Sequence, residues 1–210
     1  MAAAVTSAPE TTGRRAKQKA STRAAITLAA QELISTRGFD AVTVNDIARA
    51  ADVSHRTFYR YFPSKEDALL AAFRDFLDDF VALVAARPPT EHPLESLLGT
   101  LDTIAEAMPV DADSFNWIYE LIEGEPALGG VQHRLLIEAQ DRLTGLFASR
   151  LGAPSNSLEP RLFAAAATAS YQAAVRTWVR IPRADRTMTV WSLGREALDE
   201  FRRGLGPPSN

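Results

Sequence analysis

Hydrophobic residues recur along most of this chain at spacings of three and four positions, the period of an amphipathic helix. No segment sustains the alternation of apolar and polar residues that marks a half-buried strand. Prolines and glycines, such as Pro109 and Gly152, separate the periodic segments. The pattern therefore predicts an all-α protein of about nine helices, near residues 21–37, 43–51, 54–62, 65–87, 93–108, 113–123, 126–151, 158–180 and 187–204.

Residues 43–67, TVNDIARAADVSHRTFYRYFPSKED, predict two short helices joined by a tight turn. Thr43 and Asp46 have the spacing of a capping box, which marks the start of the first helix. Asp52 tolerates the left-handed backbone that a tight turn needs, and Ser54 suits the N-cap of the second helix. The apolar stripe of the first helix comprises Val44, Ile47, Ala48 and Ala51.

The second of these helices has one apolar and one polar face. Phe58 and Phe62 anchor it inward, whereas Arg56 and Arg60 fall on the opposite side at about 100° per residue. Guanidinium groups match the acceptors of guanine and phosphate, and the first turn of such a helix enters the major groove first. The alternative is an amphipathic helix pair within an ordinary helical domain. On the DNA-binding interpretation, bases are read by Ser54, His55, Arg56 and Thr57.

The flanking segments make this interpretation more specific. Residues 10–23 hold five basic residues and one acidic residue, and they lead into a helix that starts near Ser21 and ends at Arg37-Gly38. Ser64 and Asp67 have capping-box spacing at the start of a further helix. Together, about residues 20–70 resemble the DNA-binding domain of the TetR family of transcriptional regulators. The matching positions are Gly38, Phe39, Thr43, Val44, Ile47, Ala48, Ala51, Val53, Ser54, Thr57, Phe58, Tyr59, Tyr61, Phe62, Ser64, Lys65, Glu66 and Asp67.

The resemblance implies a role for individual residues. It assigns a phosphate contact to Thr43 and base contacts to His55, Arg56 and Thr57. Tyr61 is also compatible with core packing, and the basic arm with a solvated tail. Asp52 stands where the family usually has glycine. Further contacts with the DNA backbone are expected from Arg14, Arg15, Lys17, Lys19, Tyr59, Arg60, Tyr61 and Lys65.

Charge is distributed unevenly along the chain. The whole chain carries −3, but residues 1–66 hold ten basic and six acidic residues, a net charge of +4, which leaves −7 for residues 67–210. A basic amino-terminal third concentrates affinity for DNA at one end. The chain has no cysteine, and neither a signal peptide nor a membrane span is predicted, so we expect a cytoplasmic protein.

Three regions are predicted: a basic, disordered arm at 1–20, a helix–turn–helix domain at 21–66, and a helical effector-binding and dimerisation domain at 67–205. The helices near 158–180 and 187–204 are expected to form a four-helix bundle with a second copy, as the resemblance implies. Small side chains at 164–170, AAAATAS, permit a close approach of backbones. The alternative is that these helices pack only within their own chain.

The segment between the helix–turn–helix domain, or head, and the two expected dimer helices is predicted to sense a small molecule. In the family, a small molecule enters a cavity here, moves the linker helix (65–87 in this chain) and changes the separation of the two heads. Plain core packing is the alternative for each residue, and the weak default for the ligand is an apolar or aromatic molecule. Polar groups able to orient it are Asn116, Tyr119, His133 and Gln140. The candidate lining residues are Phe73, Phe76, Phe80, Ile104, Met108, Phe115, Trp117, Ile118, Leu121 and Phe147.

Other classes of function are less compatible with the sequence. The three histidines lack HExxH spacing, and the motifs GxSxG, GxxxxGK[ST] and GxGxxG do not occur, so neither catalysis nor a cofactor or metal is expected. A ligand-binding helical protein with a vestigial head is the second alternative, which the retained Arg56, Tyr59, Arg60 and Lys65 disfavour. The sequence thus predicts a homodimeric repressor that binds a pseudo-palindromic operator and is released by a small effector.

Overall fold

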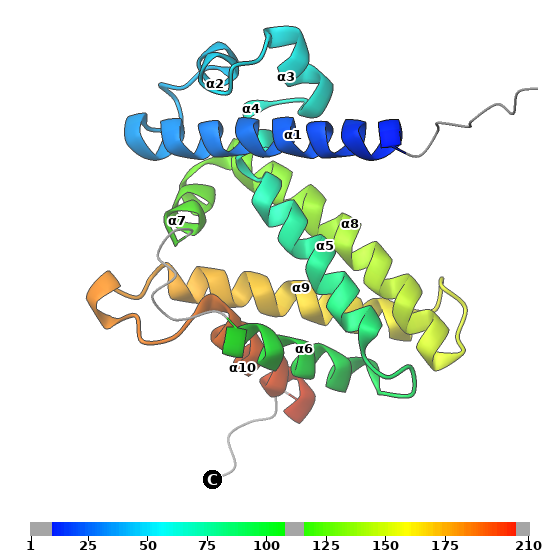
Figure 1. Cartoon of the computed structure of the whole chain (residues 1–210). Coiled ribbons are helices and arrows are strands. Elements are labelled where there is room, and N and C mark those ends of the chain that lie inside the picture. Colours follow the sequence, from blue (N-terminus) through cyan, green and yellow to red (C-terminus); the bar gives the residue numbers. More distant parts are fainter. Residues whose placement is uncertain (1–9, 108–115, 205–210) are drawn as a thin grey trace, which may run out of the picture. The chain divides into compact units, whose positions relative to one another are not determined.

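The structure is a computed structural model that describes residues 10–107 and 116–204, with side chains from Arg15 and, after the gap, from Trp117 (Figure 1). Within these ranges it contains ten α-helices and no strand, which confirms the all-α prediction. A short 3-10 turn lies at Arg183–Asp185. The helices are α1 (Glu10–Arg37), α2 (Val44–Ala50), α3 (His55–Tyr61), α4 (Lys65–Leu69), α5 (Ala71–Ala86), α6 (Pro93–Ala107), α7 (Asn116–Gly124), α8 (Pro126–Leu151), α9 (Leu158–Trp178) and α10 (Val190–Arg203).

The chain divides into two compact units, residues 1–72 and 73–210. The first holds α1 to α4, and the second holds α6 to α10 with nearly all of α5. The sequence predicts a boundary between residues 66 and 67, whereas this division by contacts places α4, which packs on α1, in the first unit.

In the first unit, α1 packs on α2 and α4, and α2 packs on α3. The capping box that begins α2 is confirmed: the Asp46 N–H donates to Thr43 Oγ1 at 3.2 Å, and the Thr43 N–H donates to Asp46 Oδ2 at 3.0 Å. These bonds satisfy amide groups that the helix itself leaves without partners. The core of this unit comprises Ile26, Ala30, Ile34, Phe39, Val42, Ile47, Phe58, Phe62 and Leu69.

The first helix begins at Glu10, earlier than the predicted start near Ser21. The arm predicted to be disordered is therefore helical over residues 10–20. Its Arg, Lys, Gln and Ala residues are strong helix formers, and a helix nucleated by the buried part of α1 extends readily into such a segment. The predicted end is confirmed, because Gly38 follows α1 with φ of 86° and its N–H donates to Ile34 O at 2.9 Å.

The linker predicted as one helix over 65–87 is instead two helices, α4 and α5, which meet at Leu70. Four consecutive side chains at this junction, Ala68 to Ala71, are at most 2% exposed. One face of a straight helix cannot bury four consecutive residues, because they spread around most of its circumference. A break in the helix at Leu70 is compatible with burying all four.

In the second unit, α9 packs against α8 and α10, and α10 packs also against α6 (Figure 1). Gly152, with φ of 61°, ends α8 in the left-handed conformation that favours glycine. In the described ranges no helix is both long and apolar enough to cross a bilayer. The main core comprises Phe80, Val84, Leu94, Leu97, Leu98, Leu101, Ile104, Leu143, Phe147, Ala164, Ala166 and Leu198.

Candidate nucleic-acid interface and internal cavity

The α2–α3 turn has the backbone that its sequence predicts. Asp52 has φ of 53° and is the one non-glycine residue with positive φ in the described ranges. Ser54 caps α3, with its Oγ accepting from the Thr57 N–H at 3.0 Å. The Ser54 hydroxyl also donates to Thr57 Oγ1 at 2.9 Å, which fixes the side chain of Thr57 in the first turn.

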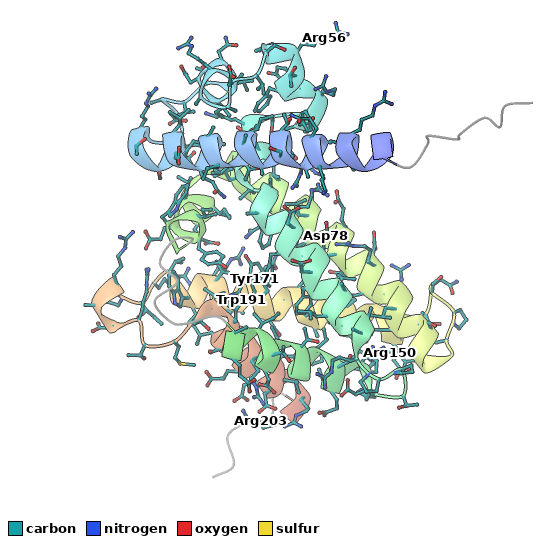
Figure 2. All side chains as sticks on the ribbon, viewed as in Figure 1. Arg56, Asp78, Arg150, Tyr171, Trp191 and Arg203 are labelled. Carbon is teal, nitrogen blue, oxygen red and sulfur yellow. The ribbon has the colours of Figure 1, made fainter. Side chains whose placement is uncertain are left out.

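The α3 helix separates an anchor from a polar outer surface. Phe58 is fully buried, whereas His55, Arg56 and Arg60 are exposed. Tyr59 is 49% exposed, and its ring meets the ring of His55 edge-on at 4.8 Å. Figure 2 shows Arg56 at the outer side of α3, pointing away from the helices of its unit. These side chains offer guanidinium, imidazole and hydroxyl groups to solvent, the groups that read base edges and bind phosphates.

At its carboxyl end, α3 meets the amino-terminal half of α1. Tyr61 is half-buried, and the Arg60 guanidinium lies 5.2 Å from the centre of its ring. A hydrogen bond with Thr22 lowers the pKa of the Tyr61 phenol, and the charges of Arg60 and Lys19 add to that shift. Basic residues of both α1 and α3 therefore lie near Tyr61. The half-buried Tyr61 is compatible with the core-packing alternative, and its contact with the DNA backbone stays a prediction.

Lys65 lies at the start of a helix, as the sequence predicts, but its side chain bonds to groups of its own unit. Its ammonium donates to Phe39 O at 2.6 Å and to Val42 O at 3.1 Å, and it lies 3.9 Å from the centre of the Phe39 ring. These bonds tie the start of α4 to the loop between α1 and α2. The ammonium is directed at carbonyl groups of its own unit, so a phosphate contact would require it to leave them.

Three basic residues of α1, Arg15, Lys17 and Lys19, are exposed on the helix, whereas the side chain of Arg14 lies outside the described residues. The sequence interpretation missed Asn45 and Arg49, which line an open polar hollow together with Ser54 and His55. Arg49 is 82% exposed at its side chain. Their spacing of four residues, on the face of α2 opposite the buried Ile47, was the available signal.

The second unit contains a cavity of about 40 Å³. It lies between α5, α9 and α10 and is also lined by leucines of α6 and α8. Two of the predicted ligand residues, Phe76 and Phe80, line it. The remaining lining residues are Leu77, Leu97, Leu101, Leu136, Ala139, Leu143, Ala167, Thr168, Ser170, Tyr171, Val190, Trp191, Gly194 and Leu198.

The other predicted ligand residues are distributed differently. Ile104 and Phe147 are buried in the main core, as the alternative interpretation had it. Phe73 stacks on Tyr171 with ring centres 5.5 Å apart. Met108 and Phe115 lie outside the described residues. The remaining three lie on α7, away from the cavity lining: Trp117, Ile118 and Leu121.

Tyr171 and Trp191 line the cavity although the sequence assigned both to the dimer helices. Figure 2 shows the two side chains close together in the interior of the second unit. Burial raises the pKa of the Tyr171 phenol well above its usual value, and the Gln132 side-chain amide donates to its oxygen at 3.3 Å. Tyr171 stands among the alanines of α9, and Trp191 among the charged residues of α10. Such isolated large rings usually pack in the interior, and this was the available signal in the sequence.

Of the polar residues expected to orient a ligand, Gln140 is hydrogen-bonded to a residue of the cavity lining. The Thr168 hydroxyl, which lines the cavity, donates to Gln140 Oε1 at 3.0 Å. Tyr119 packs edge-on against Trp178, and burial raises the pKa of its phenol. His133 is exposed, and the side chain of Asn116 lies outside the described residues. Within the described ranges no cluster of three or more metal-ligating side chains occurs.

Comparison with known proteins agrees with this arrangement. Residues 26–72 match the family described as "Bacterial regulatory proteins, tetR family", and residues 91–206 match the "MftR C-terminal domain". The transcriptional regulator TcmR of Streptomyces glaucescens is 30% identical over 207 residues, which cover 95% of this chain and 91% of TcmR. The chain belongs to the TetR family.

Other TetR-family proteins are similar over shorter lengths or in fold. The repressor KstR of Rhodococcus jostii is 39% identical over 80 residues, 38% of this chain and 37% of KstR. The structure of Thermus thermophilus FadR in complex with lauroyl-CoA superposes with a TM-score of 0.55 at 23% identity, covering 90% of this chain and 98% of that one. At that identity the likeness shows the fold alone. A regulator from Streptomyces coelicolor gives 0.54 at 25% identity, covering 90% and 99%.

The two helices that the TetR resemblance assigns to the dimer carry exposed apolar side chains. Leu158 and Leu162 of α9 are 71% and 51% exposed, and Phe201 of α10 is 41% exposed. Of the small residues at 164–170, Ala164, Ala166 and Ser170 are buried within their own chain. Ala169 is exposed on the same side of α9 as Leu162, so the approach of a second copy along this side stays a prediction.

Proposed function

We propose that this TetR-family chain is a repressor that binds a pseudo-palindromic operator as a homodimer and releases it when a small molecule occupies the cavity between α5, α9 and α10. The observation that carries the proposal is the surface of α3. It presents His55, Arg56 and Arg60 outward from a fully buried Phe58, with the half-buried Thr57 beside them. A rigid anchor beneath exposed donors is what direct reading of base edges requires.

Affinity for DNA, as distinct from sequence preference, is expected from the basic residues of α1. Arg15 and Lys19 are exposed and four residues apart, so they share a face of the helix. That face is next to Tyr61, on which Lys19 acts electrostatically. Phosphate contacts at these residues would extend the interface beyond the major groove and make binding strongly dependent on salt.

Dimerisation is needed because one seven-residue helix reads few base pairs. Two copies joined through the outward faces of α9 and α10 present two α3 helices. Two reading helices about one or more DNA turns apart, roughly 34–36 Å per turn, select a pseudo-palindrome. The exposed Leu158, Leu162 and Phe201 give this face the apolar character of a homodimer interface.

Release of DNA is proposed to act through α5. Phe76 and Phe80 of α5 line the cavity, and α5 is separated by Leu70 alone from α4, which is part of the DNA-binding unit. Displacement of α5 by a ligand is therefore transmitted along the chain to α4 in the DNA-binding unit. Such a ligand shifts the equilibrium only to the extent that it binds the released state more tightly than the DNA-bound state.

The test is footprinting of the purified full chain on genomic DNA, followed by titration of the selected fragments at several salt concentrations. The proposal predicts protected sites with twofold symmetry and binding that falls steeply with salt. It also predicts that transcription from genes next to these sites rises when the gene for this chain is deleted. Absence of any protected site at low salt would contradict DNA binding. Lower transcription in the deletion strain would instead make the chain an activator.

A further inference from the structure

We infer that the cavity takes an uncharged, flat, fused-ring aromatic molecule that carries a hydroxyl or carbonyl group and bonds through it to Ser170. This inference rests on the proposed effector role of the same cavity and adds the chemical class of the ligand. Three features of the lining carry it: its lack of charge, the orientation of its aromatic rings, and one buried hydroxyl without a partner.

No charged side chain lines the cavity in the described part of the chain. A carboxylate or phosphate brought into this space would lose its hydration without gaining an ion pair, which costs several kcal/mol. The lining is made of leucines and aromatic residues, with the hydroxyls of Thr168, Ser170 and Tyr171 on one helix, α9. The part of a ligand that lies here is therefore neutral.

The aromatic rings beside the cavity form a series of nearly parallel faces. We name Phe73, Phe76, Tyr171 and Trp191 the aromatic stack. Phe76 and Trp191 lie 4.2 Å apart at 29°, Tyr171 and Trp191 lie 5.8 Å apart at 23°, and Phe73 and Tyr171 lie 5.5 Å apart at 27°. Three helices supply these rings: α5, α9 and α10.

Aromatic pairs favour either offset-stacked or edge-to-face arrangements, and the three contacts within the aromatic stack are of the stacked kind. A flat ring system extends such a series and gains contact over its whole face. A flexible aliphatic chain gains the same contact only after its rotations are frozen, which costs entropy that a fused ring does not lose.

Ser170 supplies the directional contact. It is 7% exposed and lines the cavity, and its hydroxyl makes no hydrogen bond to any described residue. Buried polar groups usually have a partner, because leaving one unsatisfied is costly. By contrast, the neighbouring Thr168 hydroxyl already donates to Gln140 Oε1. A ligand hydroxyl or carbonyl at Ser170 supplies the missing bond.

The cavity of about 40 Å³ has room for only a few water molecules, so a ring must separate the helices that enclose it. Entry between Phe76 of α5 and Trp191 of α10 separates them by about the thickness of one ring. This opening is the difference between the empty and the occupied state that a ligand-controlled release requires.

The experiment is calorimetric titration of the full chain with matched probes. The probes are 1-naphthol, naphthalene, decan-1-ol and lauroyl-CoA. Decan-1-ol has the carbon count and hydroxyl of 1-naphthol but is a flexible and more hydrophobic chain. We expect 1-naphthol to bind once per subunit and at least about tenfold more tightly than decan-1-ol or lauroyl-CoA, a difference of about 1.4 kcal/mol.

Two substitutions locate the contacts. Ser170→Ala, a nearly isosteric change, is expected to weaken binding of 1-naphthol about fivefold, the worth of one hydrogen bond, and to leave naphthalene unaffected. Trp191→Leu is expected to abolish binding of both aromatic probes, and Trp191→Phe to restore it in part. Equal effects of Ser170→Ala on both probes would contradict the assignment of the hydroxyl.

Tighter binding of decan-1-ol or lauroyl-CoA, or no binding by either aromatic probe, would overturn the inferred class. The operator titration of the same protein, without probe, tests the proposed function separately. A chain that binds its operator but ignores 1-naphthol would refute the aromatic ligand alone. A chain that binds 1-naphthol but no DNA would refute the regulatory role while supporting the ligand class.

Discussion

At the scale of single residues, Arg56 carries most of the proposed specificity. It is exposed in the first turn of α3, whose position is fixed by the buried Phe58. Arg56→Ala is expected to lower the free-energy preference for operator over random DNA by about 1–3 kcal/mol. Competition titrations at fixed salt measure that preference.

Arg15→Ala is the matched control, because Arg15 is an exposed arginine on α1 rather than on the reading helix. Arg15→Ala is expected to weaken binding to operator and random DNA alike. It is also expected to reduce the slope of log affinity against log salt concentration by about one. If Arg56→Ala also weakened both sequences alike, its base-reading role would be refuted.

Lys65 gives a prediction about stability. Replacing it by methionine removes the bonds to Phe39 O and Val42 O, and leaves these carbonyls without that donor. Lys65→Met is expected to lower the free energy of unfolding of the first unit by about 1–3 kcal/mol. Lys19→Met, at an exposed position of α1, is the control and is expected to have little effect. Unchanged stability in Lys65→Met, measured by denaturant unfolding, would show that these contacts contribute nothing.

Local signals at single residues were the easiest to predict from the sequence. The caps at Thr43 and Ser54 and the left-handed Asp52 followed from residue type and spacing, because their causes lie within four residues. The inward turn of Lys65 depends on carbonyl groups 23 and 26 residues away, and no local pattern reports that contact.

At the scale of elements, the turn between α2 and α3 stores a small strain at Asp52, with its φ of 53°. Glycine adopts this conformation freely, whereas a β-branched residue is strongly disfavoured there. Asp52→Gly is expected to leave stability unchanged or raise it by up to about 1 kcal/mol, and Asp52→Val to lower it by about 1–2 kcal/mol. The reverse order of the two variants in thermal unfolding would exclude strain at this turn.

The packing of α7 on the loop after α9 is expected to depend on pH. Glu120 of α7 accepts from Arg183 at 2.5 Å and from Arg186 at 3.0 Å, and these hydrogen bonds lower its pKa. Because the pKa is lower in the folded chain, the stabilisation is complete above the unfolded value and is lost as pH falls through the folded one.

Glu120→Gln removes this titration. The variant is expected to be less stable than the parent at neutral pH and to lose less stability on acidification. Thermal unfolding of the two proteins at neutral and acidic pH measures the difference. Identical pH dependence in the two would show that Glu120 does not couple α7 to the loop.

Helix identity was predictable along the chain, and helix ends less so. The early start of α1 at Glu10 reflects propensity, which the sequence interpretation set aside in favour of charge. The break at Leu70 reflects burial of four consecutive residues, a tertiary effect that a periodic pattern does not reveal.

At the scale of the whole molecule, the proposed dimer depends on the outward faces of α9 and α10. Leu162 is 51% exposed on α9. Leu162→Glu places charge in the proposed apolar interface and is expected to yield monomers in sedimentation velocity, with loss of operator binding. Leu83→Glu is the matched control, since Leu83 is 41% exposed on α5, outside that face. Equal oligomeric states for the two variants would place the interface elsewhere.

The cavity shows why the sensor was only partly predictable. Phe76 and Phe80 followed from the apolar stripe of α5, but Tyr171 and Trp191 come from helices that lie later in the chain, at separations of 91 to 115 residues. Their shared cavity is created by packing between α9 and α10, which a sequence pattern does not specify. The same two helices carry the proposed dimer face, so occupancy of the cavity and the geometry of the dimer are expected to be coupled.

The most direct measurement is sedimentation velocity of the full chain on its selected DNA duplex, compared with a duplex in which one half-site is scrambled. The account predicts that an even number of chains binds the intact duplex and that scrambling either half-site removes most of the affinity. Binding of a single chain, or equal affinity for the intact and the half-scrambled duplex, would contradict it.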